Sequence, residues 1–412
     1  MFTPAHQGIN DLRAALRLAR TEQVGPRTWQ RLVAQYGSPA AALDALPGLP
    51  VRGRTKPSIP SADSIEREIE GTLALGGQFL TLLDPDYPAL LRHIPDAPPV
   101  LSVLGDAACL HQPGIGIVGA RNASAQGLRL AESLATELAD SGLTVISGLA
   151  RGIDSAAHKG ALYRQGLTIA AIAGGLDCPY PAQNATLQAH IAQMGAVITE
   201  APLGTAPQGR HFPRRNRLIA GLALGCVVVE AAPHSGTLIT ARMAADYGRE
   251  VFAVPGSPLD PRCRGSNDLL RKGAILTERA ADILPHIALP SPEYSSAGLS
   301  KTKSTLDLFA SLPPLKSDAE AHTNSKKYDL NQSIKDKLSP SSPASNPSAD
   351  PGRQLLDLLS FTPVAVDDLI RRCQFSASVV LAALTQLELS GQVTTYQDGR
   401  VGLTNGQAET SR

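Results

Sequence analysis

Positions 114–124 read Gly-Ile-Gly-Ile-Val-Gly-Ala-Arg-Asn-Ala-Ser, and the central part of the chain is built around this stretch. Ile115–Val118 is a short apolar run, typical of a buried strand, and a helical pattern follows from Gly127 to Ala139. The turn between them opens a helix, whose free backbone amides and positive dipole end suit a phosphate. Three residues of this turn are candidate phosphate contacts: Gly119, Arg121 and Ser124. The alternative is that Arg121 pairs with a neighbouring acid and Ser124 only caps the helix.

The same stretch contains the glycine spacing of a dinucleotide fingerprint, at Gly114, Gly116 and Gly119. In that fingerprint the glycines follow the strand, in the turn that enters the helix. Here the first two glycines belong to the expected strand, and no acidic residue ends a clear second strand about twenty residues further on. We therefore do not expect NAD to bind.

Similar apolar runs follow along the chain, each bounded by Gly, Pro, Ser or Glu. They are Thr144–Ile146, Thr168–Ala173, Ala196–Thr199, Gly225–Val229 and Glu250–Val254. Helical patterns separate them, as at Gly236–Tyr247. This alternation predicts an α/β fold, a largely parallel sheet with helices on both faces, whose ligands bind beyond the carboxyl ends of the strands.

Small residues gather in the turns that follow three of the other strands, where a backbone can approach a ligand closely. The candidate contacts there are Ser147, Gly148, Gly152, Ser235, Gly236, Thr237 and Gly256. Asp154 and His158 lie four residues apart on the helix that follows Gly152. We expect a helix cap and a solvated histidine there rather than a functional pair.

Four arginines and an aromatic residue lie within Arg210–Arg217, just before an expected apolar helix at Leu218–Leu224. Cations that hold phosphates and a ring that offers a stacking face suit single-stranded nucleic acid. The candidates are Arg210, Phe212, Arg215, Asn216 and Arg217. The alternative for Phe212 is a core position under the helix. Residues 205–275 contain 10 Arg and Lys and 5 Asp and Glu, which gives this segment a net charge of +5 in a chain whose net charge is +1.

The chain divides into four parts. Residues 1–80 predict small helices around the turn Val24-Gly25-Pro26, an arrangement that resembles a helix-hairpin-helix. This turn either contacts DNA or serves only the packing of the helices. Residues 81–288 form the α/β domain. Residues 289–350 are rich in Ser, Pro and Lys and predict a disordered linker. Residues 351–405 predict three helices and a hairpin, a winged helix, whose third helix contains no Lys or Arg. A role in protein contact or fold stability is therefore favoured there over DNA reading.

Global composition adds little about a ligand. The five cysteines are scattered, with no C-x-x-C pair, which argues against structural zinc and against a secreted disulfide framework. We see neither a signal-peptide pattern nor an apolar run of membrane-spanning length. The expectation is a cytoplasmic protein.

The motifs together resemble the DNA-processing protein A (DprA/Smf) family. The resemblance rests on Gly119-Ala120-Arg121-x-x-Ser124, Ser147-Gly148-x-Ala150-x-Gly152-Ile153-Asp154, Phe212-Pro213-x-Arg215-Asn216-Arg217 and Ser235-Gly236-Thr237-Leu238-Ile239-Thr240. It implies an extended Rossmann-like fold, single-stranded DNA binding, a homodimer, and protection and delivery of DNA to the RecA recombinase during natural transformation. It implies neither catalysis nor a cofactor. One departure is the segment Tyr180–Asn184, where many members carry Lys or Arg before the Asn and this chain has Ala182 and Gln183; this puts one phosphate contact in doubt.

The rival hypothesis is an enzyme. The Ser-Gly-Thr turn also resembles the loop of nucleotide-hydrolysing "lysine decarboxylase-like" proteins, in which a Glu follows the Thr by three positions. That position is Thr240 here, so the obvious acid/base is missing.

Overall fold

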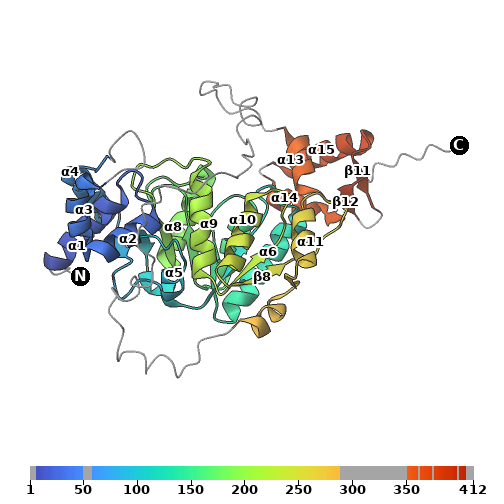
Figure 1. Cartoon of the computed structure of the whole chain (residues 1–412). Coiled ribbons are helices and arrows are strands. Elements are labelled where there is room, and N and C mark those ends of the chain that lie inside the picture. Colours follow the sequence, from blue (N-terminus) through green and yellow to red (C-terminus); the bar gives the residue numbers. More distant parts are fainter. Residues whose placement is uncertain are drawn as a thin grey trace, which may run out of the picture.

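The computed structural model describes residues 6–49, 58–287, 350–360, 362–373, 375–396 and 399–404. Figure 1 shows a helical N-terminal region, a central α/β domain and a small C-terminal domain along the molecule. The predicted linker lies outside the described residues, apart from Asp350. Within the described ranges no helix has the length and apolar character needed to cross a membrane.

The N-terminal helices pack around a buried tryptophan. They are α1 (His6–Ala19), α2 (Pro26–Tyr36), α3 (Pro39–Ala45) and α4 (Ala62–Ala74). Trp29 of α2 is fully buried, and its indole N–H donates to the carbonyl of Ala15 in α1. Pro26 occupies the first turn of α2, where its missing N–H costs no helical hydrogen bond. The predicted turn between two helices at Val24–Pro26 is confirmed.

The centre of the molecule is a nine-stranded sheet of order β1-β2-β6-β5-β4-β3-β7-β8-β9. Its strands are β1 (Gly77–Thr81), β2 (Val100–Gly105), β3 (Gly114–Val118), β4 (Thr144–Ser147), β5 (Thr168–Ala171), β6 (Ala196–Thr199), β7 (Gly225–Val228), β8 (Glu250–Ala253) and β9 (Ile275–Leu276). All pairs from β6 to β9 are parallel, whereas β2 runs antiparallel to both β1 and β6. The six predicted strands are confirmed to within two residues, and the antiparallel edge was not predicted.

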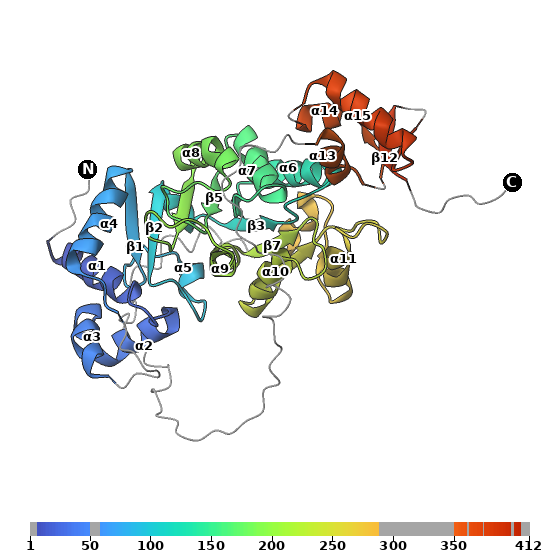
Figure 2. The ribbon, with the colours of Figure 1, turned by 90° about the horizontal axis from the view of Figure 1, so that it is seen from above.

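Helices cover both faces of this sheet, as predicted. Figure 2 shows α6 (Ala125–Asp140), α7 (Ile153–Tyr163) and α8 (Ala185–Met194) on one side and α9 (His211–Leu222) and α10 (Gly236–Asp246) on the other. Alternate strand residues serve the two faces: Ile115 and Ile117 pack in the core under α6 and α7, and Val118 packs in the core under α9 and α10. Two shorter helices complete the domain, α5 (Ala89–Arg92) and α11 (Arg264–Arg271).

The helix α9 corrects the prediction for the arginine run. It begins at His211 rather than at Leu218, so Phe212 and three of the four arginines lie in the helix and not before it. Arginine is a good helix former, and a charged first turn does not interrupt a helix whose later turns are buried.

The C-terminal domain has the predicted winged-helix elements. They are α13 (Pro351–Leu358), β10 (Val364–Ala365), α14 (Val366–Arg372), α15 (Ala377–Leu389), β11 (Val393–Thr395) and β12 (Arg400–Leu403), with strand order β10-β12-β11. Leu355, Leu369 and Val380 form its core, and Ala125 of α6 joins that core from the central domain. The small domain therefore sits against the start of α6.

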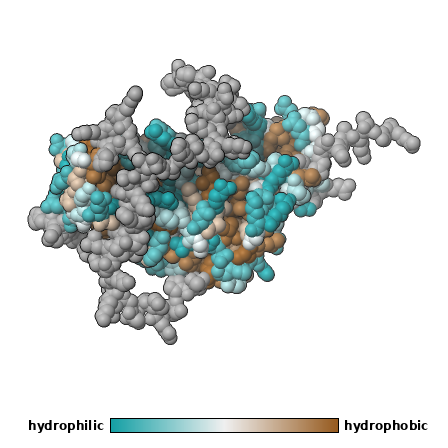
Figure 3. All heavy atoms as spheres, viewed as in Figure 1, coloured by the Kyte–Doolittle hydropathy of each residue, from teal (hydrophilic) through white to brown (hydrophobic). Residues whose placement is uncertain are grey.

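In the surface view of Figure 3, hydrophilic and hydrophobic residues alternate over the middle of the molecule, where Figure 1 places α9 and α10.

Candidate functional site

Two neighbouring strands of the sheet, β3 and β7, end at the same groove, which has a volume of about 730 Å³. We call it the main groove. It brings together residues from three separate motifs: Gly119, Arg121, Phe212, Arg215, Asn216, Ser235, Gly236 and Thr237. Two hydrogen bonds tie the motifs together, since the Thr237 hydroxyl donates to the carbonyl of Gly119 (3.0 Å) and the Asn216 amide to that of Gly236 (3.3 Å).

Phe212 is the aromatic centre of the main groove. Its ring is half-buried and belongs to none of the apolar core clusters among the described residues, so it does not pack under the later turns of α9. The Arg121 guanidinium carbon lies 4.5 Å from the ring centroid and that of Arg215 5.9 Å. The ring of Tyr180 approaches at 5.8 Å with an interplanar angle of 59°. The ring therefore has two cations close to it and lines the main groove with them.

Arg215 and Arg121 differ in how firmly they are held. Arg121 is exposed, whereas Arg215 is only 6% exposed and places its Nη1 3.5 Å from Oδ2 of Asp154. A Cβ at Gly148 would overlap the Arg215 guanidinium, so the glycine at this position makes room for the arginine. Burial raises the pKa of the Asp154 carboxyl, although the charge of Arg215 opposes this, and burial lowers the pKa of Arg215.

The helix N-terminus of α10 is open toward the main groove. Ser235 is its N-cap residue but makes no capping hydrogen bond, and its buried hydroxyl oxygen has no partner among the described residues. A Cβ added at Gly236 would meet no atom within 4 Å. Unpaired amides at the positive end of a helix dipole, with free space before them, form a site for an anion.

The N-terminus of α6 is closed, which corrects the prediction for Ser124. This serine is 2% exposed; its hydroxyl accepts from the amide of Gly127 (3.0 Å) and donates to Oε1 of Glu230 (2.6 Å). Its own amide donates to Oε2 of Glu230 at 2.9 Å. The carboxylate thus occupies the place predicted for a phosphate. Glu230, missed from the sequence, directly follows the apolar residues of β7 and Val229, and an acid in that position was the available signal.

Arg217 is also a correction, because it lies inside the protein. It is 6% exposed, and its Nη1 contacts Oδ2 of Asp96 at 3.1 Å while its Nη2 pairs with Oε1 of Glu200. Tyr247 donates its hydroxyl proton to the same Asp96 (2.8 Å). Since one helical residue turns the side chain by about 100°, adjacency to Arg215 and Asn216 did not place Arg217 in the main groove.

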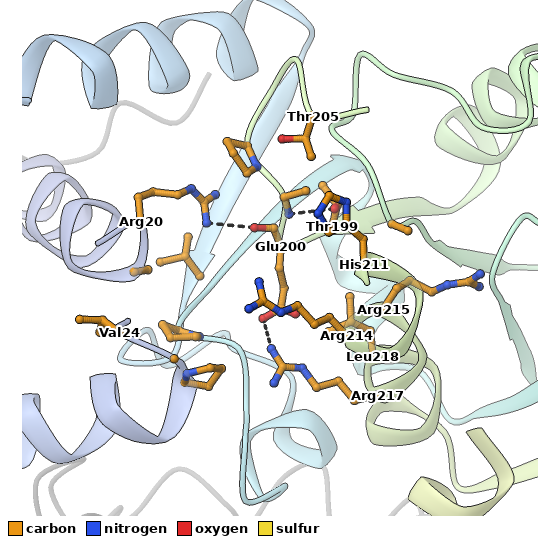
Figure 4. Close-up of a pocket in the computed structure, with 18 of the residues that line it drawn as sticks. Arg20, Val24, Thr199, Glu200, Thr205, His211, Arg214, Arg215, Arg217 and Leu218 are labelled. Atoms are coloured by element: carbon orange, nitrogen blue, oxygen red, sulfur yellow. Dashed lines mark hydrogen bonds and ion pairs between the residues drawn. The ribbon is translucent and has the colours of Figure 1, made fainter. Parts of the chain in front are cut away.

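Arg217 borders a different hollow of about 560 Å³, between the N-terminal hairpin (Thr21–Pro26) and the central domain. Figure 4 shows Arg20, Arg214 and Arg217 around Glu200 in this hairpin cavity. Arg20 pairs with Glu68 (2.6 Å) and donates to the carbonyl of Glu200 (2.9 Å). Burial raises the pKa of Glu200, against the opposing effect of Arg217. These contacts join the N-terminal helices to the sheet, and DNA contact by the hairpin stays a prediction.

The remaining predicted residues lie outside the main groove. Ser147 is fully buried and donates to the carbonyl of Ile117 (2.6 Å). Gly148 and Gly152 line adjoining hollows, Arg210 is exposed before α9, and Gly256 packs against Cys263. These residues shape the site or lie beside it.

Asp154 and His158 do not pair, but the predicted solvated histidine is wrong. His158 is fully buried, and its Nδ1 lies 2.7 Å from the hydroxyl oxygen of Thr168. Because the Thr168 hydroxyl donates to the carbonyl of Val145, Nδ1 of His158 is the donor in this contact. Burial lowers the pKa of His158 to about 3.

Three protein-family models match the chain. The model described as "DNA recombination-mediator protein A" covers residues 78–288, about half of the chain. The "DprA-like N-terminal HHH domain" matches residues 10–71, and the "DprA winged helix domain" matches residues 339–399. Each of the three parts described above thus has its own counterpart.

Individual proteins agree with these matches. Protein Smf of Synechocystis is 45% identical over 207 residues, which are 49% of this chain and 52% of that protein. The DNA processing protein DprA of Bacillus subtilis is 42% identical over 221 residues, 53% of this chain and 74% of that protein. The alignment therefore spans only about half the length of the Synechocystis relative. The X-ray structure of DNA processing protein A from Streptococcus pneumoniae superposes with a TM-score of 0.58 at 32% identity, covering 68% of this chain and 99% of that one.

Proposed function

This chain belongs to the DNA-processing protein A (DprA/Smf) family, and from that premise we propose that it binds single-stranded DNA in the main groove, without catalysis. We further propose that two copies of the chain act together, protect incoming DNA and load the RecA recombinase on it during natural transformation. The family resemblance supports these later steps, and the geometry of the main groove supports the binding of the strand itself. The single observation that carries the proposal is the ring of Phe212 beside Arg121.

An aromatic ring with arginines close to it can recognise the two parts that every nucleotide offers, the base and the phosphate. A base stacked on an aromatic side chain contributes about 1–3 kcal/mol, whatever its sequence. Arg121 lies 4.5 Å from the ring of Phe212, so an incoming base and the guanidinium compete for the same ring. We infer that Arg121 leaves the ring for a phosphate when the base arrives, which exchanges a cation–π contact for a charge-assisted hydrogen bond.

The start of α10 supplies the second phosphate contact. Ser235 and Gly236 line the same groove as Arg121; the helix start has no side-chain cap, and the buried Ser235 hydroxyl has no partner among the described residues. A backbone phosphate there would satisfy donors that the protein leaves open. Stacking, cation and amides thus come from three segments that the sheet holds at one edge.

Single strands are favoured over duplex by the same geometry. A base within a duplex must be unstacked before it can offer its face to Phe212, at a cost of a few kcal/mol. Phosphate contacts alone would not discriminate, because both forms carry phosphates.

The test is a salt series of binding titrations with labelled oligothymidylate and with duplex of equal length. We expect Arg121→Ala to lower the slope of log affinity against log salt by about 0.7 on single strands, the value of one phosphate contact. Phe212→Ala should weaken single-strand binding and leave duplex binding nearly unchanged. Arg164→Ala, which removes an exposed cation from the end of α7 outside the main groove, is the control. Unchanged binding by both variants would sink the proposal.

The rival hydrolase predicts a different outcome. At the position of its catalytic Glu stands Thr240, which is 2% exposed and carries no carboxylate. Release of free base from nucleoside monophosphates by the pure protein would favour the enzyme. Stimulation of ATP hydrolysis by RecA on single strands, lost in Arg121→Ala, would support the loading step.

A further inference from the structure

A second groove of about 730 Å³ lies between the central domain and the winged helix. We call it the outer groove. Arg121, Asn122 and Arg151 line both this groove and the main groove, so the two grooves adjoin at these residues. A nucleic-acid strand bound at Arg121 in the main groove therefore lies at the entrance of the outer groove.

The walls of the outer groove carry an excess of positive charge. Five cations and three carboxylates line it. On the α7 side, Arg151 and Lys159 are exposed, and neither makes an ion pair with any described residue. On the winged-helix side, the Arg371 side chain is 74% exposed and only 3.7 Å from Asp368 at its nearest approach.

Two of the three carboxylates are already neutralised by the contacts that seat the winged helix. Asp368 pairs with Arg129 of α6 at 2.6 Å, and Glu132 of α6 pairs with Arg372 at 3.2 Å. The third carboxylate, Asp357, makes no ion pair with a described residue and is exposed to solvent. The charge that remains available to a ligand is therefore positive.

The winged helix reaches this groove with α13 and α14, not with the helix that usually reads DNA. Arg262 donates to the backbone carbonyls of Asp357 and Leu359, and Gln126 donates to that of Pro363. Figure 2 shows α13 and α14 beside α6. The third helix, α15, is partly exposed and has no Lys or Arg. The winged helix therefore lines one side of the groove and presents no helix suited to base recognition there.

We propose that the single strand continues past Arg121 into the outer groove, where Arg151, Lys159 and Arg371 hold its backbone phosphates. This rests on the proposed function. None of the described residues that line the outer groove is aromatic, so it binds by charge and not by stacking. The main groove then selects single strands, and the outer groove, closed on one side by the winged helix, lengthens the site.

The experiment measures affinity against salt for the full chain with two oligothymidylates, of about 4 and about 16 nucleotides, a range typical of single-strand sites. Lys159→Ala and Arg371→Ala, which line the outer groove alone, should each lower the salt slope on the long strand by about 0.7, the value of one phosphate contact. On the short strand, which the main groove alone holds, neither change should alter affinity. Arg164→Ala with Arg353→Ala removes the same charge from α7 and the winged helix outside both grooves, and should match the parent on both lengths.

The outcomes separate the two proposals. Parent-like slopes on the long strand in both outer-groove variants would overturn the outer groove, as would equal weakening on both lengths. Those results leave the main groove standing if Arg121→Ala still loses both lengths. Failure of the parent to bind either length would remove the proposed function, and the outer groove with it.

Discussion

Two helices follow the neighbouring strands β3 and β7, and each has a serine as its N-cap residue. At the start of α6, Ser124 caps the helix and Glu230 holds both its hydroxyl and its amide. At the start of α10, Ser235 caps nothing and its hydroxyl has no partner in the described structure. The first helix start is closed by contacts within the protein, whereas at the second the described residues provide no such contact to the serine.

The arginines divide in the same way. Arg217 is enclosed by Asp96 and Glu200, whereas Arg121 is exposed, lies over the ring of Phe212 and makes no ion pair with a described residue. Arg217, buried between two carboxylates, is therefore not available to a phosphate in the main groove. Residue type therefore does not distinguish a ligand-binding group from a bracing group, but the presence of an internal partner does.

The largest expected effect separates these two arginines. Arg217→Ala leaves Asp96 and Glu200 without their shared cation in the interior, and should lower the free energy of unfolding by about 3–5 kcal/mol. Arg121→Ala should change it by less than about 0.5 kcal/mol, as for most surface substitutions. Urea titrations of both variants measure this, and similar losses in the two would break the comparison.

Glu230 tests the braced helix start directly. Glu230→Ala strips the buried amide and hydroxyl of Ser124 of their acceptor, and should cost about 3 kcal/mol of stability. Glu278→Ala, which removes an exposed carboxylate, should cost almost nothing. Chemical denaturation under identical salt compares the two, and a parent-like Glu230→Ala would mean that the brace contributes nothing.

The dependence of stability on pH tests the burial of His158 in α7. Burial lowers the pKa of His158 to about 3, whereas an unfolded histidine titrates near about 6.5. Below about pH 6.5, His158 therefore binds a proton in the unfolded chain but not in the folded chain. The contribution of neutral His158 is complete above that pH and falls by up to about 1.4 kcal/mol per pH unit as the pH drops toward 3.

The variant His158→Asn keeps an amide donor for Thr168 but cannot take up the proton. Its stability should fall less steeply between pH 6.5 and pH 4.5 than that of the parent, since the carboxylates titrate alike in both. Equal slopes for parent and variant would show that His158 titrates normally in the folded state.

The smallest expected effect is the difference between the two N-cap serines. Ser124→Ala removes a cap and should lower the free energy of unfolding by about 1–2 kcal/mol. Ser235→Ala removes a hydroxyl without a partner and should change it by less than about 0.5 kcal/mol. Equal losses, measured by denaturation in the absence of DNA, would mean that the start of α10 is as closed as that of α6.

The elements that the sequence predicted share one property, a strong local pattern. The strands β3 to β8 are short apolar runs between Gly, Pro, Ser or Glu, and α6 and α10 repeat apolar residues at helical spacing. The pair β1 and β2 was missed because it extends the sheet in the antiparallel sense, outside the strand–helix alternation that guided the prediction. The start of α9 was misplaced because a charged first turn carries no apolar period.

The candidate site shows where local pattern stops being sufficient. The motifs alone placed Gly119, Arg121 and Ser235 at strand ends, since parallel strands end at one edge of a sheet. They could not show that Ser124 meets Glu230, 106 residues away, or that Arg217 meets Asp96 and Glu200. A backbone pattern follows from neighbours within a few residues, but a polar side chain is free or engaged according to which distant carboxylate the fold brings to it. The sequence by itself thus determined the elements and the edge at which they converge, whereas the tertiary structure alone decided which of the serines and arginines at that edge are closed and which stay open.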